Sequence, residues 1–286
     1  MRVVVEDVAA LLFDDGLPVR AASAVAPFGD GWLIVQDDSA HAAWWRPGSV
    51  TPIRVVDATD RLKPDFQAAC AVPVHGRHGV LLLGSGSAAA RRRASLVTFT
   101  AAEPAFAVTA LDPVYHKVAA ALGRRGDQLN LAGACLIGDR LRWFQRGDAA
   151  AGGPTASVDV DLAALLGAVT GAGDAGQVEI IDVRRYDLGV VGGAVPAVTC
   201  AVALADGRVL VSAAAQDGPA VVAALALLDD DGVVDVATLP DTGGLAGKVD
   251  GLAVREVTGD GLRILAVADA GHPLVAAHQL ALRLHW

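Results

Sequence analysis

Three cysteines recur at one spacing along this chain. Cys70, Cys135 and Cys200 are each separated from the next by 65 residues. Each lies in a short apolar run that is followed by a turn and then by a second apolar run. Similar segments at an equal spacing indicate an internal repeat. The chain is therefore expected to fold as an array of similar β units.

The same paired pattern occurs five times. Short apolar runs broken by turns that contain Gly-Asp or Asp-Gly predict strand–turn–strand units. Runs that are apolar on both faces predict strands that are buried on both faces. The predicted pairs are 22–25 with 31–35, 69–72 with 79–83, 134–137 with 140–144, 199–202 with 207–211, and 251–254 with 261–265.

Further strand-like runs follow these pairs, and roughly four strands per repeat predict an all-β fold, a single β-propeller domain over residues 1–286. The number of blades follows from the distance between equivalent positions. These steps are 47, 65, 65 and 52 residues, and 57 residues close the circle. Five blades are preferred, and six remain an alternative if one 65-residue step contains a degenerate blade. The equivalent positions are Val25, Val72, Ile137, Val202 and Val254.

The two ends of the chain predict how the ring closes. The last repeat ends at 280–286 after about three strands, and the run Arg2–Phe13 precedes the first repeat without a partner. We expect this N-terminal run to supply the missing outer strand, because pairing the two ends removes exposed sheet edges. Two segments, 115–122 and 161–169, have helical character and are expected to be excursions on the outer strands.

Composition and charge exclude several classes of function. Apolar residues make up 53% of the chain and charged residues 19%, which predicts a large core. The net charge of −9 repels a phosphate backbone, so no nucleic-acid binding is expected, and the basic run Arg91–Arg93 is predicted to be a solvated loop. The longest apolar run, Ala220–Leu228, is too short to span a bilayer, so no membrane partner is expected.

The compartment is predicted from the cysteines and the N-terminus. Glu6 and Asp7 interrupt the first apolar run, which therefore does not read as a secretory signal. Three cysteines cannot all pair within one chain. We expect a reducing, cytoplasmic setting in which buried thiols act as small hydrophobic side chains.

Polar residues recur in the loops that should form one mouth of the propeller channel. These loops lead into the inner strands or link the second strand of a blade to the third. The pattern Lys-x-Asp occurs twice, at Lys63–Asp65 and Lys248–Asp250, and Asp37 and Ser85 follow second strands. Such residues could bind a small polar or anionic ligand through charge-assisted hydrogen bonds. The predicted ligand-binding residues are Lys63, Asp65, Gln67, Asn130, Arg146, Lys248, Asp250 and Asp269.

The alternative for each of these residues is a solvated loop, because strand ends are polar in most soluble proteins. Asp250, Asp269 and His272 are the candidate catalytic acids or bases. No metal site and no cofactor are predicted. A Ca²⁺ site stays as an alternative, although such sites usually need about six or more oxygen ligands, several of them carboxylates.

Several segments resemble an uncharacterised bacterial β-propeller family that is similar to the esterase-like phytase propellers. The segments 63–68, 129–134 and 248–252 resemble the segments that lead into inner strands in that family, and 82–87 and 141–147 resemble its second-strand ends. The resemblance implies a propeller whose recurring acid binds a metal or acts as a base. At the corresponding positions this chain has Gln67, Ala132 and Asp250, so one carboxylate remains.

Three functions stay open, since propellers host all of them. The first is a small-molecule-binding protein with a polar, anion-recognising site at the mouth of the channel. The second is a hydrolase of phosphoesters or lactones that uses the same face and needs a converging carboxylate or histidine. The third is a scaffold for protein partners, which should expose an apolar patch on its rim. Whether the protein is an enzyme is left open by the sequence.

Overall fold

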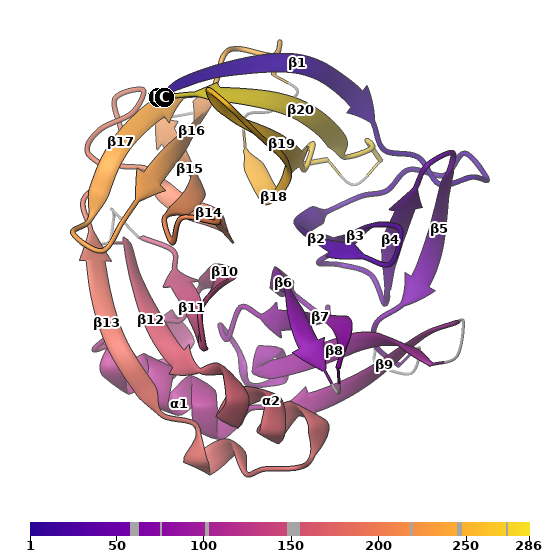
Figure 1. Ribbon diagram of the computed structural model, residues 1–286, viewed down its shortest axis with the longest axis vertical. Helices are drawn as coiled ribbons and strands as arrows, with labels where there is room; N and C mark the ends of the chain where they lie inside the picture. Colours follow the sequence, from indigo (N-terminus) through magenta and orange to yellow (C-terminus); the bar gives the residue numbers. More distant parts are fainter. Residues whose placement is uncertain are drawn as a thin grey trace.

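The protein is a ring of five four-stranded antiparallel sheets, as Figure 1 shows. A computed structural model describes residues 1–57, 63–74, 76–100, 103–147, 155–217, 220–244, 248–272 and 274–286. The sheets are the blades of a five-bladed β-propeller, so the preferred blade number is confirmed and the six-bladed alternative is wrong.

Each blade runs from an inner strand at the channel to an outer strand at the rim. Blade 1 contains β2 (Ala22–Phe28), β3 (Gly31–Gln36), β4 (His41–Arg46) and β5 (Ser49–Arg54). Blade 2 contains β6 (Phe66–Val74), β7 (Arg77–Gly84), β8 (Arg93–Thr100) and β9 (Glu103–Ala110). Blade 3 contains β10 (Leu131–Ile137), β11 (Arg140–Gln145), β12 (Thr155–Asp161) and β13 (Ile180–Tyr186). Blade 4 contains β14 (Ala197–Ala203), β15 (Val209–Asp217), β16 (Ala220–Leu228) and β17 (Val233–Thr238).

Blade 5 joins the two ends of the chain. It contains β18 (Val249–Thr258), β19 (Gly261–Ala268) and β20 (His278–His285), and its outer strand is β1 (Arg2–Ala10). Strand β1 pairs antiparallel with β20, from Arg2 opposite His285 to Ala10 opposite His278. The predicted closure by the N-terminal run is therefore confirmed, and Figure 1 shows the two termini side by side. This pairing converts two free edges into a continuous sheet.

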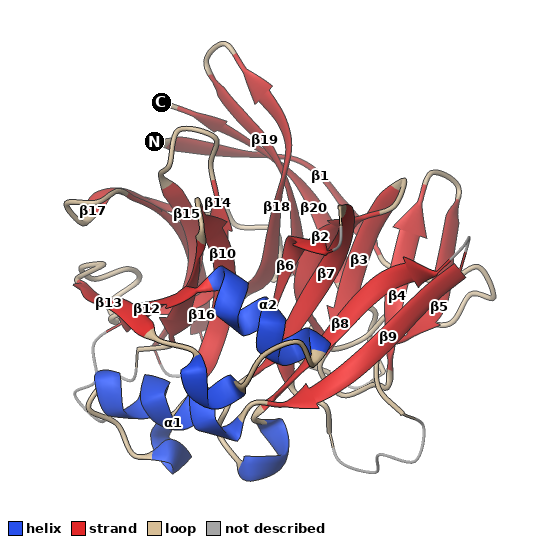
Figure 2. Cartoon of the chain, turned by 60° about the horizontal axis from the view of Figure 1, so that its bottom comes forward, coloured by secondary structure: helices blue, strands red, loops and turns tan. Residues whose placement is uncertain are grey.

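Two helices lie outside the sheets, where Figure 2 shows them together at one side of the ring. Helix α1 (Asp112–Ala121) connects blade 2 to blade 3, and α2 (Leu162–Thr170) follows β12 within blade 3. Short 3-10 helices span Ala89–Arg91, Gly126–Gln128 and Ala175–Gln177. Nowhere in the described part of the chain does a helix have the length and apolar character that a bilayer crossing requires.

The hydrophobic core lies between neighbouring blades. One buried cluster holds Cys70 with residues of blades 2 and 3, another holds Cys135 with residues of blades 3 and 4, and a third holds Cys200 with residues of blades 4 and 5. All three thiols are buried and unpaired, as predicted from their repeat. The spacing of 65 residues therefore marks one kind of contact, between an inner strand and the next blade.

Inner strands of neighbouring blades approach one another closely. A Cβ atom at Gly251 of β18 would lie 2.9 Å from the backbone nitrogen of Val25 in β2. A Cβ at Gly133 of β10 would lie 2.7 Å from the backbone nitrogen of Ala201 in β14, and Gly133 also has a φ of +86°. Glycine is needed at both positions because a narrow ring brings backbone against backbone.

Candidate functional site

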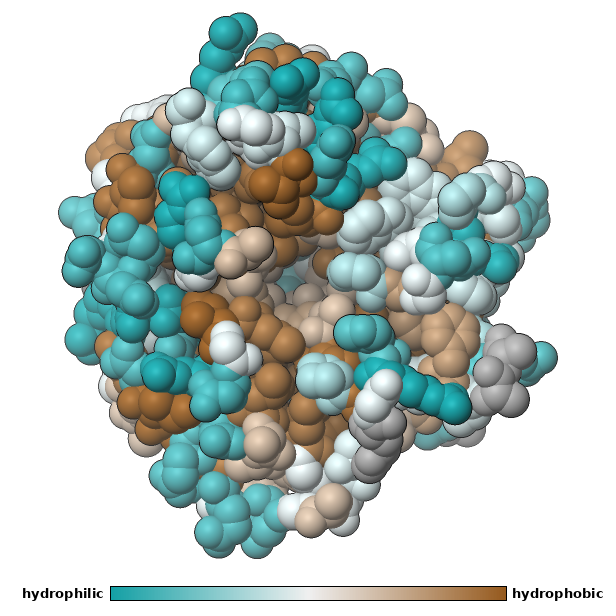
Figure 3. All heavy atoms as spheres, in the orientation of Figure 1, coloured by the Kyte–Doolittle hydropathy of each residue, from teal (hydrophilic) through white to brown (hydrophobic). Residues whose placement is uncertain are grey.

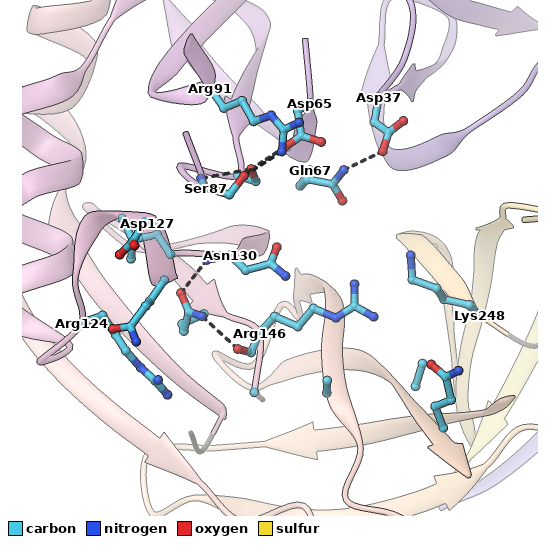
Figure 4. Close-up of a pocket in the computed structure, with 18 of the residues that line it drawn as sticks. Asp37, Asp65, Gln67, Ser87, Arg91, Arg124, Asp127, Asn130, Arg146 and Lys248 are labelled. Atoms are coloured by element: carbon cyan, nitrogen blue, oxygen red, sulfur yellow. Dashed lines mark hydrogen bonds and ion pairs between the residues drawn. The ribbon is translucent and has the colours of Figure 1, made fainter. Parts of the chain in front are cut away.

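A pocket of about 900 Å³ opens at one mouth of the channel. Figure 4 shows polar side chains converging on it from several blades. They come from the two kinds of loop that the sequence singled out, before inner strands and after second strands. Of the predicted ligand-binding residues, the structure brings six to the pocket wall: Lys63, Asp65, Gln67, Asn130, Arg146 and Lys248.

The other two, Asp250 and Asp269, and the candidate catalytic residue His272 do not line this pocket. Asp250 is buried behind Lys248 with 3% of its surface exposed. The Asp269 carboxylate accepts a hydrogen bond from the backbone N–H of Gly271 in the loop after β19. Nδ1 of the exposed His272 accepts a hydrogen bond from the backbone N–H of Leu274. These contacts give Asp269 and His272 a local role in shaping their loop.

A β-bulge at the pocket end of every inner strand sets which side chains face the mouth. In each blade the pairing of first and second strand shifts register, between Ala22 and Ala24 in blade 1 and between Val249 and Gly251 in blade 5. A bulge leaves a residue unpaired and turns its side chain out of the regular alternation. Strand periodicity alone does not reveal these shifts. The inner-strand residues that these shifts leave without a cross-strand partner are Ser23, Gln67, Ala132 with Gly133, Thr199 and Asp250.

Asp65 is the centre of a charged network in blade 2. Its carboxylate lies 3.2 Å from Nη1 of Arg91 and 3.5 Å from Nζ of Lys63, and it accepts a hydrogen bond from the Ser85 hydroxyl. Nη1 of Arg91 also donates to the Ser87 hydroxyl at 2.8 Å. Asp65 has a φ of +56°, a left-handed conformation that aspartate tolerates better than most residues. The network holds two cations beside one buried carboxylate.

Arg91 is a pocket residue that sequence reasoning missed. The run Arg91–Arg93 was predicted to be a solvated loop, yet Arg91 lines the pocket and pairs with Asp65. Arg92 instead lies beside Asp112, with 3.8 Å between Nη1 and Oδ1. Arg124 and Asp127, from the loop after α1, also line the pocket and were not predicted. The turn after β7 and the connecting helix bring these loops in, and neither has a repeat signal.

Asp37 lies next to this network at the end of β3. Its Oδ2 lies 2.8 Å from Nζ of Lys63 and accepts a hydrogen bond of 2.9 Å from Nε2 of Gln67. Burial raises the pKa of Asp37, and the contacts from Lys63 and Gln67 oppose that rise. Asp37, Lys63, Asp65 and Arg91 together bring two negative and two positive charges, so this part of the mouth is close to neutral.

The Arg146 side chain brings a further cation into the mouth. Its backbone is fixed, because its N–H donates to the carbonyl of Asn130 at 2.9 Å and its own carbonyl accepts from Nε2 of Gln145 at 3.0 Å. Among the described residues, none forms a hydrogen bond or an ion pair with its guanidinium. Figure 4 shows that guanidinium pointing into the pocket, between Asn130 and Lys248. Guanidinium is a strong bidentate donor to carboxylate and phosphate groups.

The Lys248–Asp250 pair lies across the mouth from Asn130. Nζ of Lys248 is 2.6 Å from Oδ1 of Asp250, whereas Oδ2 of Asp250 is buried and has no hydrogen-bond partner among the described residues. Burial raises the pKa of Asp250 to about 6, opposed by the positive charges of Lys248 and Arg146, while Asp269 adds to the rise. A carboxyl that titrates near neutral pH is suited to proton exchange.

Charge and donor chemistry limit what the mouth can bind. Its lining includes five cationic side chains and three carboxylates, which is a positive excess in a chain of net charge −9. In the described ranges, no group of three or more His, Cys, Asp or Glu side chains is arranged to hold a metal ion. The Ca²⁺ alternative stays a prediction. The cations are Lys63, Arg91, Arg124, Arg146 and Lys248, and the carboxylates are Asp37, Asp65 and Asp127.

The other end of the channel has the opposite character. An apolar pocket of about 280 Å³ there is lined by inner-strand residues of all five blades, Cys70 and Cys135 among them. Figure 3 shows this face, with hydrophobic residues around its central opening. Among the described residues, the charged side chains that line these two pockets all belong to the polar mouth.

We expect the three thiols to be unreactive in the folded protein. Burial raises the pKa of Cys135 and of Cys200 to about 12, and that of Cys70 well above its usual range. Because the thiolate is the nucleophile, labelling by a disulfide reagent at pH 8 should be about 100-fold slower than in denatured protein. Rapid release of one equivalent from the native protein would contradict this prediction.

Solved structures share the propeller fold at low sequence identity. A putative glycosidase from Bacteroides thetaiotaomicron aligns with a TM-score of 0.52 and 10% identity, over 93% of this chain and 86% of that one. An endo-arabinase from the same organism gives 0.48 and 10%, over 97% and 98% of the two chains. A putative gluconolactonase gives 0.41 and 14%, over 96% of each. The similarity to the putative glycosidase shows a shared fold and leaves the activity open.

A comparison with curated protein sequences finds no match. A comparison with sequence families does find one, and it covers four of the five inner strands together with the pocket residues from Lys63 to Lys248. Because that family model matches residues 59–273, most of the chain, the protein belongs to the family of unknown function DUF6910.

Proposed function

We propose that this propeller is a small-molecule-binding protein that recognises an anionic ligand in the polar mouth of its channel. The observation that carries the proposal is the guanidinium of Arg146, which points into the pocket with no protein partner among the described residues. A partly buried cation without a counter-ion is costly, and an anionic ligand would supply one.

The pocket has the size and composition of a ligand site. Its volume of about 900 Å³ lies within the range of roughly 300–1,000 Å³ that is typical of small-molecule pockets. Its wall carries more cations than carboxylates, which favours anions over cations and neutral molecules. The acidic surface elsewhere disfavours large polyanions, so a small anion is preferred.

The proposal predicts that Arg146→Met weakens anion binding at least tenfold. Inorganic phosphate is titrated into the protein by calorimetry at pH 7.5 and low ionic strength. Loss of one charge-assisted bidentate contact should cost about 1.5–3 kcal/mol, which corresponds to tenfold or more in the dissociation constant. Arg255→Met is the matched control, because Arg255 is an exposed arginine on β18 that does not line this pocket.

Two results would overturn the proposal. One is that the wild-type protein binds no anion, neither phosphate nor a carboxylate, at millimolar concentration. The other is that Arg146→Met and Arg255→Met weaken binding equally, which would show that only the overall charge matters.

A hydrolase acting at the same mouth is the alternative, and Asp250 is the observation that favours it. Its buried carboxyl has a pKa of about 6, so it could exchange protons near neutral pH. The resemblance to the esterase-like phytase propellers adds phosphoesters to the candidate substrates, beside lactones. Hydrolysis of p-nitrophenyl phosphate or of δ-valerolactone that is lost in Asp250→Asn would support this alternative, and equal rates in both proteins would oppose it.

A protein-interaction role also has one supporting feature. Leu17 and Leu274 are 61% and 78% exposed, and with Phe13 they line a shallow pocket where blade 5 meets blade 1. Exposed apolar groups of this kind occur at protein interfaces. The feature lies outside the polar mouth, so it does not compete with the ligand site.

A further inference from the structure

We infer that the ligand is a polyhydroxylated anion, such as a sugar acid or a sugar phosphate, held with its anionic group at Arg146 and its hydroxyl groups at Asp37 and Gln67. This inference rests on the proposed function and names the class of ligand. It follows from the uneven distribution of charge and of hydrogen-bonding groups around the mouth.

One half of the mouth is cationic. Arg146 and Lys248 extend toward the same part of the pocket in Figure 4, from blades 3 and 5. Lys248 forms an ion pair with Asp250, whereas Arg146 forms none with a described residue and acts on Asp250 only from a longer distance. This half therefore has a positive charge to neutralise. An anionic group of the ligand placed here would accept hydrogen bonds from the guanidinium and approach the ammonium.

The other half is polar but close to neutral. Asp37 and Asp65 are matched by Lys63 and Arg91, which lie within 2.8–3.5 Å of their carboxylate oxygens. Carboxylates that already have a cationic partner offer little attraction to a further ammonium group. This balance disfavours a zwitterion such as a free amino acid, which would need an unpaired carboxylate opposite Arg146.

The neutral half is rich in groups that bind hydroxyls. Carboxylate oxygens accept hydrogen bonds, while the side-chain amides of Gln67 and Asn130 can both donate and accept. The Gln67 amide is oriented by its 2.9 Å hydrogen bond to Asp37, and its place at a β-bulge turns it toward the mouth. Figure 4 shows Gln67 and Asn130 on facing sides of the pocket. A chain or ring of hydroxyl groups between them would meet donors and acceptors together.

Size also argues against a simple inorganic anion as the full ligand. The pocket of about 900 Å³ is large compared with a single phosphate or carboxylate group, and its polar lining continues well beyond Arg146. Buried polar groups without partners are costly, so a ligand that spans both halves should bind more tightly than one that fills the cationic half alone.

The test compares probes that carry the two features separately and together. Calorimetry at pH 7.5 measures D-gluconate and D-glucose 6-phosphate, which carry both, against propionate and inorganic phosphate, which are anions without alcohol hydroxyls, and D-glucitol, which is neutral. We expect gluconate to bind at least tenfold more tightly than propionate and glucitol, or glucose 6-phosphate at least tenfold more tightly than phosphate and glucitol. Tighter binding of gluconate than of propionate would indicate a carboxylate ligand, and tighter binding of glucose 6-phosphate than of phosphate would indicate a phosphate ligand.

Two variants separate the halves. Gln67→Ala should weaken the polyhydroxylated anion about tenfold and leave the affinity for inorganic phosphate within twofold. Arg146→Met should weaken both. Melting temperatures within about 2 °C of the wild type would show that the fold is kept in each variant.

The outcomes are distinguishable from failure of the proposed function. If phosphate binds through Arg146 but neither polyhydroxylated anion gains over it or over propionate, this inference is wrong and the proposed function stands. Binding of glucitol as tight as that of gluconate, or an equal loss of phosphate and sugar-anion affinity in Gln67→Ala, would also overturn the inference. If no anion binds at all, the proposed function itself fails.

Discussion

Replacing Arg142 with methionine is expected to lower the free energy of unfolding by about 3–5 kcal/mol, because it removes both hydrogen bonds to a buried carboxylate and leaves that carboxylate only Arg140 at 3.9 Å. Arg142 of β11 and Asp159 of β12 face each other in the sheet and are 3% and 1% exposed. Nε and Nη2 of Arg142 donate to Oδ1 and Oδ2 of Asp159 at 2.7 and 2.8 Å. At roughly 2 °C per kcal/mol, the melting temperature should fall by about 6–10 °C.

The matched variant is the double replacement Arg142→Met with Asp159→Leu. Exchanging a whole buried ion pair for apolar side chains of similar size is often neutral. The double variant should therefore be more stable than either single variant, as measured by urea unfolding followed by tryptophan fluorescence. If the two single losses add up in the double variant, the pair is not coupled and the expectation is wrong. Neither residue lines the mouth, so phosphate binding should be unchanged.

Replacing Asp250 with asparagine is expected to make the free energy of unfolding less sensitive to pH between pH 4 and pH 7. Burial raises the pKa of this carboxyl from 3.8 to about 6 in the folded protein. Well below pH 3.8 both the folded and the unfolded state carry the proton. Above pH 6 both are ionised, and the folded state bears the whole cost of the buried charge, about 3 kcal/mol for this difference in pKa.

The wild-type protein should therefore lose stability as the pH rises through this range. The difference in unfolding free energy, Asp250→Asn minus wild type, should grow by about 2–3 kcal/mol from pH 4 to pH 7. Asp7→Asn removes an exposed carboxylate of β1 and controls for the change in net charge. A difference that stays constant over this range would show that Asp250 is not a buried titrating carboxyl.

Much of the ring was readable from the sequence because its inner strands are apolar on both faces. Val25, Val72, Ile137, Val202 and Val254 each lie in the inner strand of a separate blade. The repeat survives in these strands because they are buried between neighbouring blades, where few side chains fit. The N-terminal strand was also predictable, since an apolar run without a partner must pair somewhere.

The candidate mouth was predictable only in part. Lys63, Asp65 and Arg146 follow from chain topology, because the same two loops recur on one face of every blade. Arg91, Arg124 and Asp127 do not, because a turn and a helical connection without a repeat bring them to the pocket. Asp250 was placed at the correct blade, but a β-bulge and burial behind Lys248 separate its carboxyl from the pocket wall.

The sequence by itself determined the class of fold and the face on which polar loops gather, and it favoured five blades over six. These properties depend on hydrophobic periodicity and chain order, which are local along the sequence. Only the tertiary structure decided which charges of the mouth are paired. Lys63, Arg91 and Lys248 have carboxylate partners, and Arg146 has none among the described residues. Pairing depends on distances of a few ångström between side chains from different loops, and Coulomb energies change steeply over such distances.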